Sequence, residues 1–475
     1  MEKIGHRQSL SRSAMKAMGL FGSLQVLTIL CSVVRVKCVA LWIGAAGLGL
    51  FTIYNAAITL ISTITQLNLR SSSVREIAAA SPDRRDLISA VTRRWGWLLG
   101  VAGAVVMTAT APVFSIRTFG DYGYTLPFAL LAAGVLLNSA CAGEQSVMQG
   151  RGELRQLASS TLWASVAGLL ACLPLVYFLG DTGIIPSIIA YSAAGYAAAH
   201  LYRSRLAPVR TTSGDLWRTG GPMLRLGAFM TVAAAFTELL NYILITYINT
   251  RGGTSEVGIF QAGYTMVNRY VGMVFAALGT EFYPRLAAAS ESPMRQQTFV
   301  SHEVLVLLLT MLPLILIFIP FVSIAVTILY SSEFTGAVPY VILALPGMVA
   351  RVCVWCWSFV ILARGDGRTY IITEALCDTI TLAAAIAGYA LCGMSGLGAS
   401  FSISTILSLA VIGPVYFRVY RLRMARPVVR LFAGSLLLSI AGAVTAYLWT
   451  PWAILPVGLI AALPCLKALR KLLNS

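Results

Sequence analysis

The chain has 475 residues, of which 58% are hydrophobic and only 11% are charged, and its formal net charge is +17. Because a soluble protein carries roughly 25% charged residues, this composition excludes a soluble domain and indicates many segments buried in lipid. The 35 Lys and Arg residues are scattered between apolar segments, so they form no continuous basic face of the kind that binds nucleic acid.

Fourteen apolar segments are predicted to cross a membrane. Residues 1–16 come first and form a basic, polar tail, and the first apolar run is too long for the h-region of a cleavable signal peptide. Each later segment has about the 20 residues that a membrane-spanning helix needs. In chain order the segments are expected at about 19–43, 47–69, 95–116, 125–148, 157–179, 182–202, 226–249, 257–280, 303–329, 337–362, 369–391, 396–417, 431–449 and 452–466.

No segment alternates with period two, so the predicted fold is an all-α integral membrane protein and not a β-barrel. We expect a two-lobed helical bundle of about 14 transmembrane helices. Residues 1–205 would form an N-terminal lobe of six spans, and 206–225 a cytoplasmic linker. Residues 226–425 would form a C-terminal lobe of six spans, and 426–475 would add a C-terminal hairpin.

The basic residues predict the orientation in the membrane. With the N-terminus in the cytoplasm, 29 of the 35 Lys and Arg residues fall on cytoplasmic segments or on the span ends beside them. Only Arg117 and Arg251 fall near the outer side. Cytoplasmic loops carry such an excess of positive charge, so both termini are predicted to be cytoplasmic.

Short matches at a nearly constant offset predict that the two lobes are duplicated halves. A shift of 209 residues places 49–51 (GLF) on 258–260 (GIF), and a shift of 213 residues places 151–155 (RGELR) on 364–368 (RGDGR). Duplicated lobes with the binding site at their interface are a common plan of transporters. We therefore expect the first two spans of each half to face a central cavity.

Four cations lie within predicted spans, where a charge is costly unless it faces water or a partner. Arg35 lies roughly 16 residues into the first span, or about 24 Å at 1.5 Å per residue. Lys37 points to another face, about 200° around the helix, and is expected to extend toward the outer surface. Arg269 and Arg351 lie in the middle of later spans. The alternative for the three arginines is a buried salt bridge, for instance with Glu238.

A cavity that holds Arg35 and Arg269 would be cationic, and its natural ligand is a dianion such as a pyrophosphate. Arginine suits this ligand because its planar guanidinium binds phosphate oxygens bidentately and stays charged. Arg351 is a further candidate for the same cavity. Asn55 in the second span and Asn268 beside Arg269 could hydrogen-bond sugars, although bonding between helices is at least as good an alternative.

Three acids within spans are candidates for binding a coupling ion. Glu374 and Asp378 are spaced i,i+4, so they share one face of a helix. Such a pair could bind a proton or Na⁺, although Glu374 is close enough to the cytoplasmic end for interfacial solvation. Glu238 lies mid-span and could carry a proton or pair with an arginine.

Three stretches of the chain resemble Wzx-type polysaccharide flippases of the MOP exporter superfamily (multidrug, oligosaccharidyl-lipid, polysaccharide). They are 34–37 (VRVK) leading to 44–51 (GAAGLGLF), 73–78 (SVREIA) and 149–152 (QGRG). The resemblance implies a 12-helix MOP core, to which residues 426–475 add the hairpin. It also implies that Arg35 and Arg269 contact the pyrophosphate of a lipid-linked glycan.

By this resemblance the protein would be a flippase of the bacterial cytoplasmic (inner) membrane. It would move an undecaprenyl-pyrophosphate-linked oligosaccharide, such as an O-antigen unit for lipopolysaccharide, by alternating access. Its expected partners are that glycan lipid, membrane lipid, a coupling H⁺ or Na⁺ and a glycan polymerase complex, with no nucleic acid. The motifs do not separate an O-antigen translocase from a lipid III flippase or another glycan-lipid flippase.

Two other classes are weighed against the flippase. A MATE-like multidrug exporter of organic cations would need an acidic, aromatic cavity, whereas this one is predicted to be basic. A membrane-embedded glycan polymerase or ligase would need a large outer loop with catalytic groups, whereas the predicted outer loops are short. The sequence contains no P-loop or metal motif. The spacing of Cys353 and Cys356 favours packing over redox chemistry. We therefore expect no enzyme, cofactor or metal.

Overall fold

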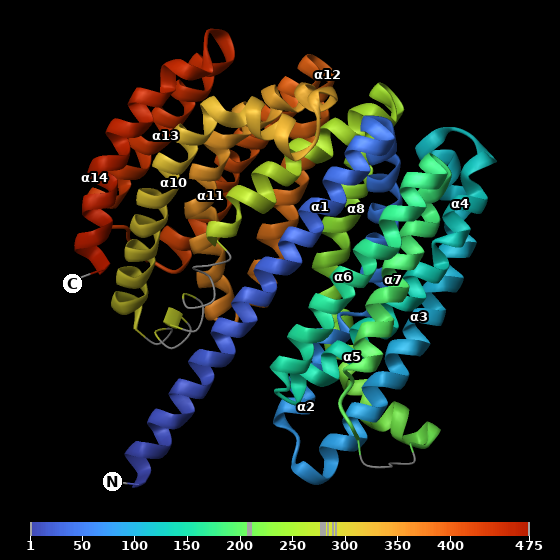
Figure 1. Ribbon diagram of the computed structural model, residues 1–475. Helices are drawn as coiled ribbons and strands as arrows, with labels where there is room; N and C mark the ends of the chain where they lie inside the picture. The colour runs from blue at the N-terminus through green and yellow to red at the C-terminus, as the bar shows by residue number, and fades with distance from the viewer. Residues whose placement is uncertain are drawn as a thin grey trace. The chain divides into compact units, whose positions relative to one another are not determined.

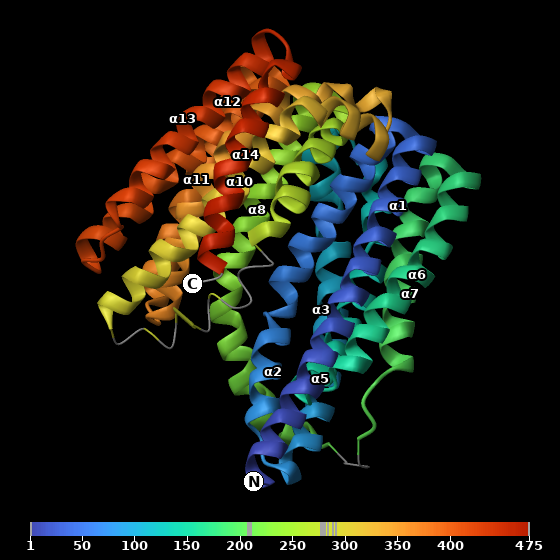
Figure 2. The ribbon, with the colours of Figure 1, turned by 60° about the vertical axis from the view of Figure 1, so that its left-hand side comes forward.

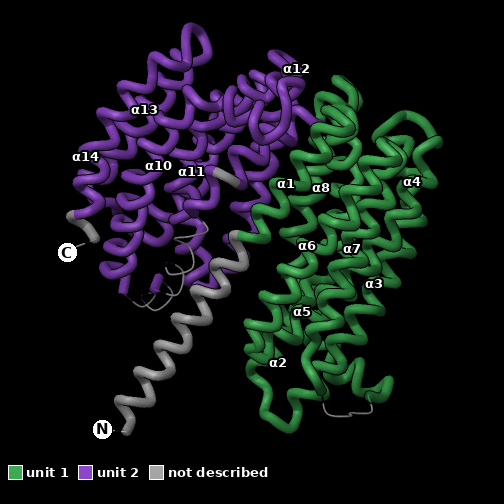
Figure 3. Tube along the Cα trace, viewed as in Figure 1, with its two compact units in different colours: residues 1–257 green, residues 258–475 purple. Residues whose placement is uncertain are grey.

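The computed structural model is built from helices over the residues that it describes (Figure 1). These residues are 2–206, 211–275, 282, 285–286, 289 and 292–473, and for 2–26, 270 and 471–473 only the backbone is described. The chain divides into two compact units, Met1–Val257 and Gly258–Ser475 (Figure 3). Each unit is a helical bundle and is described by itself.

Unit 1 contains the first seven α-helices and most of the eighth. Their bounds are α1 Glu2–Gln66, α2 Leu69–Ala79, α3 Pro82–Phe119, α4 Thr125–Leu130, α5 Ala132–Gly150, α6 Leu154–Leu179, α7 Ile184–Leu201 and α8 Ser213–Thr265. Two 3₁₀ turns, η1 Tyr122–Tyr124 and η2 Gly180–Gly183, connect neighbouring helices. Helices α6 and α7 run side by side in both ribbon views (Figures 1 and 2).

Unit 2 contains the rest of the chain. Its α-helices are α10 Pro293–Leu329, α11 Ala337–Ala363, α12 Gly367–Pro414, α13 Arg426–Leu448 and α14 Leu455–Leu473. Two 3₁₀ turns, η4 Ser332–Gly336 and η6 Pro451–Ile454, join helices. Two short π-helices, η3 Met266–Val271 and η5 Val415–Val419, continue α8 and α12.

Two of the longest helices break at a glycine. Helix α1 breaks at Gly44 (φ 65°) and α8 breaks at Gly253 (φ 80°), and only glycine adopts such dihedrals without strain. A continuous helix would separate Arg35 from Phe51 by about 24 Å. Instead, the guanidinium carbon of Arg35 lies 5.7 Å from the centre of the Phe51 ring. Helix α1 is therefore a hairpin, as the glycine-rich turn predicted.

Ten helical segments in the described part of the chain are long and apolar enough to cross a membrane. Four of them have 40 residues or more, which is at least twice the ~20 residues of one crossing. These four are Leu27–Gln66, Leu154–Leu201, Ser213–Phe275 and Gly367–Val419. The chain is thus a multi-pass membrane protein. The number of about 14 spans and the cytoplasmic position of the termini stay predictions.

The region expected as a linker, 206–225, is partly helical because α8 begins at Ser213. The Thr212 hydroxyl donates to the Asp215 carboxylate at 2.7 Å, and the Asp215 N–H donates back to that hydroxyl oxygen at 3.3 Å. This reciprocal arrangement caps the first turn of a helix. Residues 207–210 of the expected linker, and 276–280 at the end of the span expected at 257–280, lie outside the described residues.

Two turns 213 residues apart have the same backbone geometry. Gly152 (φ 76°) and Gly365 (φ 70°) occupy equivalent positions. Each turn contains five backbone hydrogen bonds, and every bond in unit 1 has a counterpart 213 residues later in unit 2. The series starts with the Arg151 N–H, which donates to the Val147 C=O, in unit 1 and with the Arg364 N–H in unit 2. Both arginines reach back to an earlier helix of the same unit. Arg151 pairs with Asp86 on α3 at 2.5 Å, and Arg364 donates to Gln296 on α10 at 2.8 Å. These matches support the predicted duplication.

Small residues bring the helices of unit 1 close together. Gly96 on α3 faces Gly143 on α5 so closely that a Cβ built at Gly96 would lie 3.1 Å from the Gly143 Cα. The Ser139 hydroxyl donates across the same contact to the Gly96 carbonyl at 2.8 Å. In a bilayer, lipid tails are as apolar as leucine, so helices associate through such close packing and hydrogen bonds.

Candidate functional site

Arg35 of unit 1 is a cation held between aromatic rings. It lies on the first segment of α1, and its guanidinium carbon is 4.1 Å from the centre of the Tyr191 ring on α7 and 5.7 Å from that of Phe51. The side chain is half-buried, and its Nε is buried without a hydrogen-bond partner. No salt bridge to Arg35 is found among the described residues, so the alternative of a pair with Glu238 is not observed.

The position of Tyr191 depends on a glycine of the neighbouring helix. A Cβ built on Gly168 of α6 would overlap the Tyr191 ring, so any larger residue there would displace the ring from Arg35. Tyr191 was not predicted as a site residue, because it is one tyrosine in an apolar segment far from Arg35 in the sequence. Stacking on an aromatic face stabilises a guanidinium by about 0.5–2 kcal/mol and leaves the edge of its fork open to an anion.

Three other predicted residues of unit 1 lie on α1 and α8. Lys37 is half-buried on α1. Asn55 uses its side-chain amide to donate to the Phe51 carbonyl at 2.7 Å, one turn earlier in its own helix. Glu238 is half-buried on α8 and shares a hydrogen bond with the Asn241 side chain. Asn55 thus fits the local alternative that the sequence left open.

In unit 2, the predicted pair Asn268 and Arg269 lies on the π-helix η3. The Gly272 N–H donates to the Val267 carbonyl, five residues back, at 3.2 Å, which is the bond that defines this wider turn. Arg269 is exposed, and no salt bridge to it is found in the described part of the chain. Single π-helical turns are frequent at functional sites, and the sequence did not predict this one.

Arg351 of α11 is tied to the same π-helix. Its guanidinium donates to the side-chain amide oxygen (Oδ1) of Asn268 at 2.5 Å. One turn earlier α11 carries Pro346, and the Ser402 hydroxyl of α12 is inserted into the helix there. That hydroxyl accepts from the Gly347 N–H at 2.9 Å and donates to the Leu343 carbonyl at 2.6 Å. A proline and an inserted side chain both interrupt the hydrogen-bond ladder of a helix, and Arg351 lies on the next turn of α11.

Of the two acids predicted on one helix face, Glu374 lies near enough to Arg351 to interact with it electrostatically. Glu374 is also within electrostatic range of Asp378, and it accepts from the Ser358 hydroxyl at 3.4 Å. Tyr370 lies close to both acids. Unit 2 therefore brings Arg351, Asn268, Glu374 and Asp378 into one polar cluster, which we call the Arg351 cluster. From the sequence, its cation and its acids were predicted as separate sites, and Ser358 and Tyr370 were not predicted.

The described residues contain no group of three or more His, Cys, Asp or Glu side chains that could hold a metal ion. Cys353 and Cys356 are buried, free thiols. The arginines of the two units differ in whether they already have a partner within the protein. Arg35 and Arg269 have no acidic partner among the described residues, whereas Arg351 donates to the Asn268 side chain and lies within electrostatic range of the Glu374 carboxylate.

Comparisons with known proteins place the fold. The chain is similar to the structure of the lipid II flippase MurJ in an inward closed conformation, at 13% sequence identity and a TM-score of 0.65 over 96% of this chain and 100% of that one. It is also similar to an inward-facing multidrug resistance MATE family transporter of the MOP superfamily, at 16% identity and a TM-score of 0.59 over 85% and 95% of the two chains.

A third similar structure is a MOP superfamily transporter from Pyrococcus furiosus, at 15% identity and a TM-score of 0.56 over 87% of this chain and 94% of that one. No curated protein matches the sequence. The family model described as "polysaccharide biosynthesis protein" matches residues 15–290, more than half of the chain. The chain therefore belongs to the polysaccharide biosynthesis protein family of membrane transporters and has the fold of the MOP superfamily.

Proposed function

We propose that this protein is a flippase of the bacterial cytoplasmic membrane that moves an undecaprenyl-pyrophosphate-linked oligosaccharide to the outer leaflet by alternating access. Family membership supports a role in polysaccharide biosynthesis. Every such glycan lipid carries a pyrophosphate, and this is the group that the guanidinium groups of Arg35 and Arg269 suit.

The observation that carries the proposal is the state of Arg35. A cation within a span is expensive unless a counter-charge or water compensates it. Arg35 stacks on Tyr191 at 4.1 Å, retains a buried Nε without a partner and has no acid paired with it among the described residues. A transported dianion would supply the missing counter-charge, because guanidinium and phosphate form two parallel charge-assisted hydrogen bonds.

Arg269 is proposed as the second pyrophosphate ligand, since it is exposed on a π-helical turn. Arg351, Lys37, Asn55 and Asn268 are kept as proposed residues of the substrate site. The hydrogen bond from Arg351 to Asn268 favours a supporting role for Arg351, which would fix the turn that carries Arg269. Coupling to H⁺ or Na⁺ is proposed for Glu374 and Asp378, with Glu238 as a further candidate.

Complementation in cells tests the proposal. Bacterial strains that lack a known glycan-lipid flippase would receive the wild type, Arg35→Ala or Arg269→Ala, with surface glycan as the readout and membrane expression measured in parallel. Arg251→Ala is the matched control, because Arg251 also lies over an aromatic ring, Tyr247, at 5.7 Å but is exposed. We expect rescue by the wild type and by Arg251→Ala and loss of rescue in the other two.

Rescue by well-expressed Arg35→Ala and Arg269→Ala would retain the flippase and refute the cationic site. If no strain is rescued, export of organic cations by the same protein decides between the flippase and a multidrug exporter. Binding of radiolabelled undecaprenyl pyrophosphate by the purified protein, displaced by unlabelled lipid and not by organic cations, is the result that the proposal requires.

A further inference from the structure

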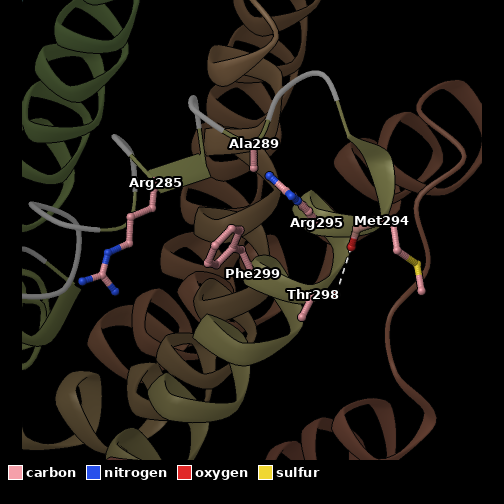
Figure 4. A pocket seen from close by; sticks show the side chains of 6 residues that line it. All are labelled: Arg285, Ala289, Met294, Arg295, Thr298 and Phe299. Carbon is pink, nitrogen blue, oxygen red and sulfur yellow. Dashed lines mark hydrogen bonds between the residues drawn. The ribbon is translucent and has the colours of Figure 1, made fainter.

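A pocket of about 480 Å³ lies at the first turns of α10 in unit 2, and none of the residues that line it is assigned above to transport. Its lining residues are Arg285, Ala289, Met294, Arg295, Thr298 and Phe299 (Figure 4). The volume is in the range of sites that bind small molecules, about 300–1,000 Å³. The pocket is open to the surface, so the side chains that line it decide which ligand it can bind.

The lining combines two cations with exposed apolar groups. In Figure 4 the Phe299 ring lies between the two arginines, and Arg295 extends toward Ala289. Both arginines are exposed. Beside them, Met294 and Phe299 expose 71% and 40% of their surfaces. The Thr298 hydroxyl donates to the Met294 carbonyl at 2.9 Å, so it is not a free donor toward a ligand.

The place of the pocket relative to the bilayer follows from the helix that carries it. Helix α10 begins at Pro293 and is one of the candidate membrane spans. Its first turns come before the stretch expected to span the membrane, about 303–329, so they lie on the headgroup side of the apolar core. The positive-inside pattern predicts that this end is cytoplasmic. The first turn of a helix also carries partial positive charge from its unpaired N–H groups.

We propose that this pocket binds the headgroup of an anionic phospholipid from the cytoplasmic leaflet. The two guanidinium groups match the phosphate, since arginine binds phosphate oxygens in a fork. The exposed Met294 and Phe299 match the glycerol and the first methylenes of the acyl chains. A soluble phosphate has no use for exposed apolar groups at the mouth of its site, whereas a lipid headgroup requires them. The pocket would thus orient the start of α10 at the anionic surface.

Lipid binding to the purified full-length chain tests the proposal without any transport assay. The protein in detergent is titrated with phosphatidylglycerol or with phosphatidylcholine of the same acyl chains, and bound lipids are counted by native mass spectrometry. Attraction to an anionic leaflet is worth about a factor of five in affinity per arginine. The double variant Arg285→Gln/Arg295→Gln should therefore bind phosphatidylglycerol about 25-fold more weakly, with phosphatidylcholine binding unchanged.

Two controls keep the result specific. Arg426→Gln/Arg430→Gln removes the same charge from exposed arginines at the start of α13 and should leave phosphatidylglycerol binding intact. Met294→Gln keeps both cations and should weaken binding of the lipid but not of inorganic phosphate. Equal losses in both double variants would overturn the proposal, as would no loss in Arg285→Gln/Arg295→Gln. Displacement of the lipid by inorganic phosphate at equal concentration would overturn it in favour of a soluble anion.

Discussion

Replacement of Arg35 by methionine tests whether Arg35 binds a ligand or supports the fold, because the two roles predict opposite effects on stability. Methionine keeps the length and the contact with the Tyr191 ring but removes the charge. The loss of cation–π stacking costs about 0.5–2 kcal/mol, and a sulfur–aromatic contact restores about 0.3–1.5 kcal/mol. Removal of an unpaired cation also relieves a desolvation penalty. We expect the free energy of unfolding of Arg35→Met to be unchanged or higher.

Binding should change in the other direction. A hydrogen bond to a charged group contributes about 1.5–3 kcal/mol, so loss of the Arg35 contact should weaken binding of undecaprenyl pyrophosphate about 10- to 150-fold. Arg35→Lys keeps the charge but not the planar guanidinium. Its affinity for undecaprenyl pyrophosphate should therefore lie between those of the wild type and Arg35→Met. The assay is thermal unfolding and equilibrium binding of the same purified preparation in detergent.

Arg93→Met is the reference for a structural arginine. Arg93 pairs with Glu144 at 2.7 Å, with side-chain exposures of 18% and 6%, and donates to the Ser204 carbonyl at 2.7 Å. Removal of one partner of a buried pair costs about 3–5 kcal/mol, so this variant should unfold at a clearly lower temperature. If Arg35→Met is destabilised as much as Arg93→Met while its binding is unchanged, Arg35 is structural and the reasoning is refuted.

The remaining predictions concern unit 2 and the paired turns. Arg351→Met removes the donor to the π-helical turn and should destabilise the protein by about 1–3 kcal/mol; an unchanged melting temperature would show that the contact is dispensable. Gly152→Ala and Gly365→Ala each force a side chain into a left-handed conformation and should each cost about 1–2 kcal/mol; a neutral effect at one glycine alone would contradict equivalent turns. Hydrogen bonds from Thr369 hold the pKa of Asp366, in the turn between spans, below its ordinary value. At pH values above the unfolded pKa of about 3.9, the ionised carboxylate therefore stabilises the fold. This stabilisation is lost as the pH falls through the lower pKa of the folded state. The difference in melting temperature between the wild type and Asp366→Asn should accordingly disappear in acid, and a difference that does not change with pH would refute this origin.

Features that depend on local sequence could be predicted from the chain alone. A glycine-rich turn after an apolar run indicated the hairpin in α1, and Gly44 does break that helix with a left-handed φ. The match between RGELR and RGDGR indicated a repeat, and Gly152 and Gly365 have the same conformation. In both cases the backbone conformation requires a particular residue type, so the sequence pattern carries the information.

Contacts between distant helices could not be predicted in the same way. Arg35 was an obvious candidate because a charge is rare within a span, but its partner Tyr191 is a common residue in an apolar helix. The contact between Arg351 and Asn268 depends on a π-helical turn, and no residue type specifies that turn. These features follow from how helices pack in three dimensions, and apolar sequence encodes that packing only weakly.

The central claim, that the chain moves a lipid-linked pyrophosphate across a bilayer, is tested most directly in proteoliposomes. Purified protein is reconstituted with a radiolabelled undecaprenyl-pyrophosphate-linked oligosaccharide, and the fraction of glycan that reaches the opposite leaflet is measured with a membrane-impermeant glycosidase. We predict translocation that depends on the protein and falls at least tenfold in Arg35→Met, while Arg251→Ala retains the wild-type rate. No translocation of a panel of glycan lipids, together with translocation of an organic cation, would contradict the account.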